Sequence, residues 1–284
     1  MAYMLSKLSI ALKITNWCNM NCAHCCARSS YDHPLNMMPL SNAESYVQEF
    51  KNLHVVPKWD YVCLTGGEPM GPYFYNSKEY IRNILGIIYD SGLKPVIKTN
   101  AAWGKNYLLR AQILKDIADM AYRGGKSMLL DFSIDEFHNN LPETANIMTD
   151  ILDSKYLNPA IMMELVGFKT RASSILLEKL KNLLKDRGIH MESINKDECA
   201  AFSGNIGAKI FLDFNSTVIA MGRAIDNVIS DKAASGESHP IFGNCLQIDE
   251  ENIATLNYKY MATVKNGDLQ PVVMNLLKHL LCRN

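Results

Sequence analysis

The sequence lacks an excess of charge of either sign, because 29 Lys and Arg residues balance 29 Asp and Glu residues in 284. Proteins that bind nucleic acids or anionic membranes in general need an excess of cations, so the balance argues against both classes. The sequence also lacks an apolar run of the ~18 residues that a membrane helix needs. Its first residues lack the long apolar region of a secretory signal. We therefore expect a cytoplasmic protein with neither nucleic-acid nor membrane partners.

Internal repeats, low-complexity segments and proline-rich linkers are absent as well. Hydrophobic residues make up 48% and charged residues 20% of the chain, which is ordinary for a globular protein. A chain of this length buries a full core without disulfide bonds. The eight cysteines of a protein that is not exported therefore fit metal ligands or buried thiols better than a disulfide framework.

Short apolar segments alternate with helical patterns along most of the chain. The predicted strands cover residues 8–15, 60–65, 94–99, 127–133, 160–167, 189–194 and 208–220, and the predicted helices cover residues 42–53, 77–91, 107–122, 143–154 and 173–185. Such alternation is typical of βαβ units, whose right-handed crossovers build a parallel sheet. We expect an α/β fold, a partial (β/α)6 barrel over residues 1–228. Residues 229–284 are expected to form a small C-terminal extension packed on it, with a helix near residues 272–281.

Four of the cysteines lie within nine residues, directly after the first predicted strand. Cys18, Cys22 and Cys25 form a C-x3-C-x2-C run, and three thiolates on one loop can hold three irons of a cubane iron–sulfur cluster. The alternatives are a zinc loop or buried thiols, but zinc sites usually contain C-x2-C pairs and a fourth ligand. His24 lies between two of the cysteines, where little room remains for it to reach the same ion. We expect the adjacent Cys26 not to be a ligand.

Together with a second motif, these cysteines resemble the radical S-adenosylmethionine (SAM) enzymes. Gly66-Gly67-Glu68-Pro69 follows the second predicted strand, and the resemblance covers roughly residues 8–225. It implies that Cys18, Cys22 and Cys25 bind one 4Fe–4S cluster, whose open iron chelates SAM. It also implies a donor such as flavodoxin or ferredoxin, whose electron cleaves SAM to methionine and a 5′-deoxyadenosyl radical. That radical abstracts hydrogen from the substrate.

The resemblance implies further SAM-binding residues at the strand ends. Gly66, Gly67 and Glu68 are expected at the SAM amine, where paired glycines let backbone carbonyls approach closely. His24 occupies the position before the last cysteine, where the family usually has a ring that packs beside the adenine. The other expected contacts are Asn100 after the third strand, Ser133 and Asp135 after the fourth, and Met221 in the segment Met221-Gly222-Arg223-Ala224 after the sixth.

The catalytic residues are less clearly indicated. Glu136 and His138 follow the fourth predicted strand and are candidates to bind or deprotonate a substrate at the barrel mouth. Either could instead be a solvated or packing residue. Trp103 is a further candidate to face the substrate. The fifth strand lacks the glycine-rich adenine motif of the family, and Glu164 and Met163 are open candidates to contribute there.

The resemblance favours a radical SAM enzyme acting on a peptide, such as a natural-product precursor, or on a small metabolite. Many peptide-modifying members add a leader-recognition domain before the core and auxiliary clusters after it. The first cysteine is residue 18, and Cys199, Cys245 and Cys282 are widely spaced, so we expect neither addition. A second enzymatic interpretation is an activase that makes a glycyl radical on a partner enzyme. The non-enzymatic alternative is a zinc- or cluster-bearing scaffold.

Overall fold

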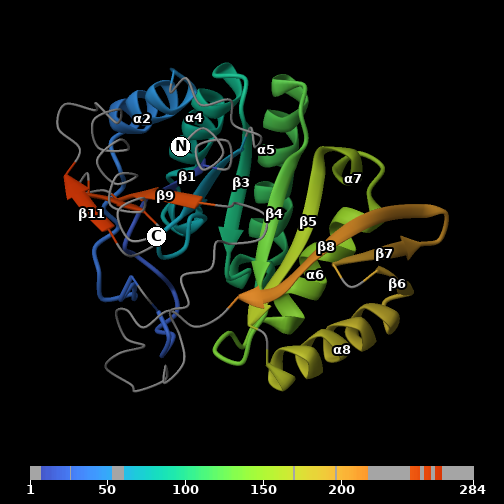
Figure 1. Cartoon of the computed structure of the whole chain (residues 1–284). Coiled ribbons are helices and arrows are strands. Elements are labelled where there is room, and N and C mark those ends of the chain that lie inside the picture. The colour runs from blue at the N-terminus through green and yellow to red at the C-terminus, as the bar shows by residue number, and fades with distance from the viewer. Residues whose placement is uncertain are drawn as a thin grey trace.

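The computed structural model describes residues 8–25, 27–52, 61–168, 170–195, 197–216, 244–249, 253–256 and 260–263. Its centre is a parallel sheet (Figure 1). The strands of this centre are β1 (Leu8–Lys13), β2 (Tyr61–Thr65), β3 (Lys94–Thr99), β4 (Met128–Ser133), β5 (Ile161–Phe168) and β8 (Ile206–Ser216). Each is hydrogen-bonded in parallel to the next. The predicted succession of six parallel strands is confirmed.

Helices connect the strands of this centre. The long ones are α2 (Leu40–Asn52), α4 (Lys78–Asp90), α5 (Tyr107–Gly124), α6 (Leu141–Asp153) and α8 (Arg171–Lys185), and the short ones are α3 (Gly71–Phe74), η1 (Ala102–Lys105) and α7 (Leu157–Ala160). The long helices begin and end within a few residues of the predicted bounds. No helix in the described part of the chain is long and apolar enough to cross a membrane.

Both edges of the sheet carry strands beyond the parallel centre. β6 (Ile189–Asn195) and β7 (Glu198–Ser203) form an antiparallel hairpin beside β8, so the strand predicted at residues 189–194 is an outer strand. At the other edge, β9 (Asn244–Ile248) runs parallel to β1 and is followed by β10 (Ile253–Leu256) and β11 (Tyr260–Thr263). The described strands therefore form one mixed, mostly parallel sheet in the order β11-β10-β9-β1-β2-β3-β4-β5-β8-β7-β6.

Part of the predicted domain organisation falls outside the described residues. The boundary at residue 228 and the helix near residues 272–281 both do. The described strands between residues 244 and 263 belong to the same sheet as the centre. The division at residue 228 stays a prediction.

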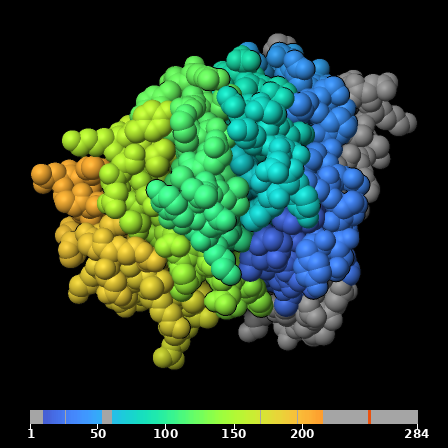
Figure 2. All heavy atoms as spheres, turned by 180° about the vertical axis from the view of Figure 1, so that it is seen from behind, coloured from blue at the N-terminus to red at the C-terminus, as the bar shows by residue number. Residues whose placement is uncertain are grey.

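The large hydrophobic core lies between the sheet and the helices. Figure 2 shows the side of the molecule that the helices cover, with their atoms in bands from the blue of α2 to the yellow of α8. Their apolar residues, such as Ile84 and Ile117, pack against strand residues such as Leu64 and Leu130, and all four are buried. Burial of this apolar surface is the main stabilising contribution to such a fold.

The inner face of the sheet carries a smaller core and a row of charged residues. Side chains alternate between the two faces along each strand. Ala11, Cys63, Val96 and Leu129 form a second hydrophobic cluster on the inner face. Lys98 and Asp131 lie two residues beyond Val96 and Leu129, toward the carboxyl ends of β3 and β4, and Asp131 is paired in register with Lys98 and with Glu164 of β5. The polar end of the inner face is therefore the carboxyl end of the strands, where sites in parallel sheets usually lie.

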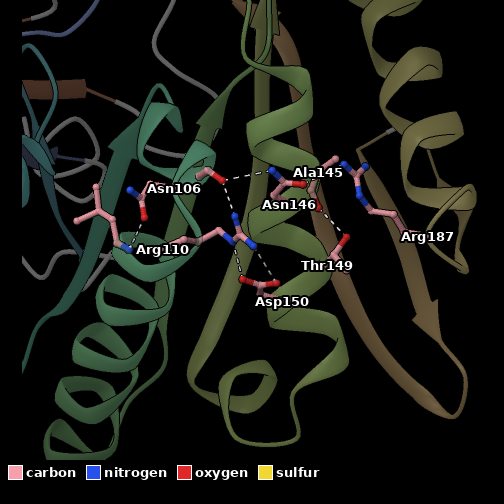
Figure 3. Close-up of polar contacts among 9 residues, drawn as sticks. Asn106, Arg110, Ala145, Asn146, Thr149, Asp150 and Arg187 are labelled. Atoms are coloured by element: carbon pink, nitrogen blue, oxygen red, sulfur yellow. Dashed lines mark hydrogen bonds and ion pairs between the residues drawn. The ribbon is translucent and has the colours of Figure 1, made fainter.

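A polar network joins the helices beside the end of β3 (Figure 3). The Arg110 Nε of α5 lies 2.5 Å from Asp150 Oδ2 of α6, and Arg110 also donates to the Gly104 carbonyl at 2.6 Å. The Asn146 amide donates to the same carbonyl and accepts from Arg187 at 2.9 Å. Because Arg110 is only 8% exposed, this network holds the loop after β3 firmly against α6.

Candidate functional site

The turn after β2 packs directly against the chain that leads into the cysteine loop. The Gly67 N–H donates to the Thr15 carbonyl at 2.8 Å, and the Glu68 N–H donates to the Trp17 carbonyl at 2.9 Å. A Cβ on Gly67 would lie 1.9 Å from the Trp17 oxygen, and one on Gly66 (φ +132°) would lie 2.3 Å from the Thr15 oxygen. Only glycine fits at either position. The structure thus shows a close approach of this turn to the protein's own backbone, and its contact with the SAM amine stays a prediction.

The Glu68 carboxylate joins the ends of β2 and β3. It is fully buried, and its Oε1 accepts from the Met70 N–H at 3.0 Å and the Thr99 hydroxyl at 2.8 Å. Its Oε2 accepts from the Asn100 N–H at 2.8 Å. Burial raises the pKa of Glu68 to about 7, although the three hydrogen bonds favour the ionised form. Glu68 thus fixes the backbone of Asn100, a role that the sequence did not reveal. Its contact with SAM stays a prediction.

Asn100 reaches from the end of β3 to the cysteine loop. Its Nδ2 lies 3.0 Å from Asn19 Oδ1 and 3.5 Å from Cys18 Sγ. Its Oδ1 accepts from the Ala102 N–H at 3.0 Å. The predicted SAM-binding residue therefore contacts a predicted cluster ligand.

Asn140 is a residue of this site that the sequence did not indicate. Its Nδ2 donates to the Asn100 carbonyl at 2.7 Å and to the Ser133 carbonyl at 2.9 Å, so it ties the end of β3 to the end of β4. Asn140 occupies the N-cap position of α6, but its side chain makes no capping hydrogen bond. Asparagine before a helix normally indicates a cap, so the sequence held no signal for its contact with the strands.

The three predicted ligand cysteines lie on the loop between β1 and α2, and none of them forms a disulfide bond. Cys18 is buried, whereas Cys22 and Cys25 are half-buried. Burial, followed by the charge of Glu68, raises the pKa of Cys18 to about 12. Such a thiol keeps its proton at neutral pH until a metal replaces it.

A cluster and a zinc ion place different demands on the three thiols of this loop. In a cubane cluster each thiolate binds a different iron, whereas a zinc ion needs all of its ligands at one point. Among the described residues, one group of three or more ligating side chains has its ligand atoms within 4.8 Å of one another, and it consists of His24, Asp135 and His138.

The turn after β4 lies over the cysteine loop. The His138 Nδ1 lies 2.8 Å from Asp135 Oδ1, and the His24 ring stacks on Phe137 with 4.4 Å between the ring centroids. Burial lowers the pKa of His138, but its hydrogen bonds to Asp135 and Cys22 outweigh burial and raise the pKa to about 10. Burial likewise opposes ionisation of Asp135, yet its bond to His138 leaves its pKa lowered. Asp135 and His138 therefore form a pair in which the charged imidazole is favoured, and the role of His138 toward a substrate stays a prediction.

Other predicted residues lie apart from this cluster or outside the described part. Glu136 is exposed and accepts from the Thr170 and Ser173 hydroxyls at 3.3 and 3.2 Å, so it supports the start of α8. Trp103 is fully buried and donates from Nε1 to Thr99 Oγ1 at 2.9 Å, so it does not face a substrate. The segment of residues 221–224, with Met221, lies outside the described residues, and so does Cys26.

Residues 12–147 match a sequence model of the radical SAM superfamily. This part of the chain belongs to the radical SAM superfamily. The match runs from β1 into α6 and so contains the cysteine loop, the glycine turn and the ends of β3 and β4. Membership supports an enzyme that uses SAM and an iron–sulfur cluster.

Two solved structures illustrate the similarity. Streptococcus suis SuiB is 12% identical, with a TM-score of 0.44, over 94% of this chain and 65% of that chain. Native anSMEcpe with bound AdoMet is 15% identical, with a TM-score of 0.42, over 63% of this chain and 49% of that chain. This chain thus matches just under two thirds of the SuiB chain and about half of the anSMEcpe chain. No curated protein matches the sequence.

Proposed function

We propose that this protein is a radical SAM enzyme in which Cys18, Cys22 and Cys25 hold a single 4Fe–4S cluster. The observation that carries the proposal is the position of the cysteine loop, within the match to the radical SAM superfamily, where it contacts Asn100 at the end of β3 and Phe137 in the turn after β4. When bound, the cluster supplies the electron that cleaves SAM to a 5′-deoxyadenosyl radical. The radical then abstracts hydrogen from the substrate.

The chain's own residues hold the surroundings of the cluster. Gly67 and Glu68 fix the backbone before Cys18 through the Thr15 and Trp17 carbonyls. The His138 imidazolium, paired with Asp135, adds a positive charge beside Cys22, which favours a thiolate ligand there. Ser133 and Asp135, at the next strand end, are the proposed polar contacts of SAM, and His24 is proposed to pack beside its adenine.

The substrate we propose is a peptide, such as a natural-product precursor, or a small metabolite. The electron donor we propose is a flavodoxin or ferredoxin in the cytoplasm, a reducing compartment that suits described cysteines without disulfide bonds. Trp17, next to Cys18, packs against Phe74 and Tyr75, which are 40% and 55% exposed. These two rings give a donor an apolar surface close to the cysteine loop.

Anaerobic cleavage of SAM tests the proposal. The reconstituted protein is given SAM and dithionite, and 5′-deoxyadenosine is measured together with iron and sulfide. We expect product from the wild type and none from Cys18→Ser, Cys22→Ser or Cys25→Ser. Cys63→Ser is the matched control, because Cys63 is a cysteine without a disulfide bond on the inner face of β2, outside the loop. Product from any of the three loop variants, or a fully iron-loaded wild type that makes none, would refute the proposal.

A further inference from the structure

We infer that Asn100 sets the reduction potential of the cluster by donating a hydrogen bond from its side-chain amide to the sulfur of Cys18. The inference rests on the proposed function, because it assumes that Cys18 is a cluster ligand. It gives Asn100 a role as a positioning residue that acts through a ligand, in place of the SAM contact that the resemblance implied. Four observations carry it: the amide's orientation, the second donor at the sulfur, the burial, and the rigid support of Asn100.

The neighbours of Asn100 determine which way its amide points. Its Oδ1 faces the Ala102 N–H, which is a donor, at 3.0 Å. Its Nδ2 faces two acceptors, Asn19 Oδ1 at 3.0 Å and Cys18 Sγ at 3.5 Å. A side-chain amide nitrogen carries two hydrogens, one for each of these acceptors. The flipped orientation would place oxygen against oxygen and nitrogen against an N–H, so the N–H···S direction is the one that the network permits.

The Cys18 sulfur receives donors from two sides. The Met20 N–H lies 3.4 Å from Cys18 Sγ, within the cysteine loop, and Asn100 adds a donor from the end of β3. Cys18 is 7% exposed and Asn100 is 6% exposed, so water competes little for this sulfur. A hydrogen bond in such surroundings has a larger electrostatic effect than one in water. Among the three cysteines, Cys18 is the most deeply buried ligand.

Asn100 itself is held by two buried neighbours. The Glu68 carboxylate accepts from its backbone N–H at 2.8 Å, and the Asn140 side chain donates to its carbonyl at 2.7 Å. Both neighbours are almost fully buried. The amide is therefore held in place before a cluster binds, so little entropy is lost when it donates to a ligand thiolate.

Hydrogen bonds to the sulfurs are among the factors that set the potential of an iron–sulfur cluster. The reduced cluster carries one more negative charge than the oxidised cluster, and part of that charge lies on the cysteine sulfurs. A donor aimed at Cys18 therefore stabilises the reduced form more than the oxidised form and raises the reduction potential. Removal of the donor makes the cluster harder to reduce. A tenfold fall in the ratio of reduced to oxidised cluster at a fixed potential corresponds to about 59 mV for one electron.

The experiment is a redox titration of the anaerobically reconstituted full chain without SAM, followed by the EPR signal of the reduced cluster. Asn100→Ala removes the donor. Asn100→Asp removes it as well but keeps an oxygen for the Ala102 N–H, and it adds a negative charge near Cys18. Asn19→Ala is the matched control, because it removes the other acceptor of the same Nδ2 and leaves the hydrogen bond to sulfur intact.

We expect Asn100→Ala to lower the ratio of reduced to oxidised cluster at a fixed potential by about tenfold, which is about 59 mV. Asn100→Asp should lower it further, and Asn19→Ala should be no harder to reduce than the wild type. A wild-type potential in Asn100→Ala, with weakened SAM binding, would return Asn100 to the SAM site and overturn the inference. Loss of iron from both Asn100 variants while Asn19→Ala retains it would also overturn it, because Asn100 would then be a structural support. A wild type without any cluster would instead refute the proposed function.

Discussion

A Cβ on Gly67 would lie 1.9 Å from the carbonyl oxygen of Trp17, the residue before Cys18. The atom that this Cβ would meet belongs to the backbone of Trp17, so no side chain can turn aside to relieve the clash. The turn after β2 and the start of the cysteine loop are therefore one packed unit, and a change in the turn acts directly on the ligands.

Gly67→Ala should displace the cysteine loop. The added methyl group clashes with the Trp17 carbonyl, and relief requires a backbone shift next to Cys18. We expect iron retention after reconstitution to fall several-fold, together with stability. Gly86→Ala is the matched control, because a Cβ there meets only Met120 Cε at 3.7 Å in the middle of α4. It should retain iron fully and unfold at equal or higher urea, since alanine is favoured over glycine inside a helix by up to about 1 kcal/mol.

Glu68→Gln should loosen the junction of β2 and β3. One carboxylate oxygen becomes an amide N–H that faces the N–H of Met70 or Asn100, and a buried donor is left without an acceptor. We expect a loss of about 1–3 kcal/mol in the free energy of unfolding, measured by urea denaturation of the metal-free protein. Glu79→Gln, which alters an exposed pair with Arg82, should change stability by less than about 1 kcal/mol. Equal stabilities for the two variants would show that Glu68 does not join the strands.

The folded state of Glu164→Gln should gain stability relative to that of the wild type as the pH rises. Glu164 is fully buried, and neither carboxylate oxygen has a hydrogen-bond partner within the described part of the chain. Burial, followed by repulsion from Asp131, raises its pKa from the ordinary 4.5 to about 9. The folded protein thus holds a proton that the unfolded chain releases, so the stability from this group is greatest below the ordinary pKa and is lost as the pH rises through the raised pKa.

The amide that replaces the Glu164 carboxyl group does not titrate, so the substitution removes this loss. Between pH ~6 and pH ~8 the stability of Glu164→Gln relative to the wild type should rise by at least about 1 kcal/mol, as urea midpoints at the two pH values would report. Glu178→Gln, at an exposed pair with Lys181, provides the comparison and should show little such slope. If the difference in stability between Glu164→Gln and the wild type did not change with pH, the raised pKa of Glu164 would be contradicted.

Arg110→Met should destabilise the helix layer without altering the cluster. It leaves Asp150 without its ion pair and removes a donor from the Gly104 carbonyl. We expect a loss of about 1–3 kcal/mol in urea unfolding. The EPR signal and the SAM cleavage per bound iron should match the wild type, because the partners of Arg110, Asp150 and the Gly104 carbonyl, are not part of the cysteine loop. A changed EPR signal would show that this network reaches the cluster after all.

The alternation of strands and helices was predictable because it depends on local hydrophobic patterns. The order of the outer strands was not: β6 and β7 form a hairpin that lies beyond β8, and only pairing between distant segments decides that placement. The strands between residues 244 and 263 were missed for the same reason, since they join the sheet through β9, whose partner is the distant β1.

Residues that belong to a sequence motif could be predicted, whereas the roles of residues that depend on tertiary contacts could not. The cysteine loop and the glycine turn were located from their spacing, although the glycines contact Thr15 and Trp17 rather than open space. Glu136 and His138 are close neighbours in the sequence, yet one supports α8 and the other pairs with Asp135. Asn140 has the sequence signature of a helix cap but binds two strand ends. Local pattern alone does not determine which partner each side chain meets in the folded chain.

The EPR spectrum of the reduced protein with and without SAM tests the central claim most directly. If Cys18, Cys22 and Cys25 hold a 4Fe–4S cluster with one iron open to SAM, the anaerobically reconstituted wild type should show a reduced-cluster signal that changes shape when SAM is added. Cys63→Ser should behave in the same way, and Cys25→Ser should show neither signal nor change. A wild type that binds zinc in place of iron, or a cluster signal that SAM leaves unchanged, would contradict the account.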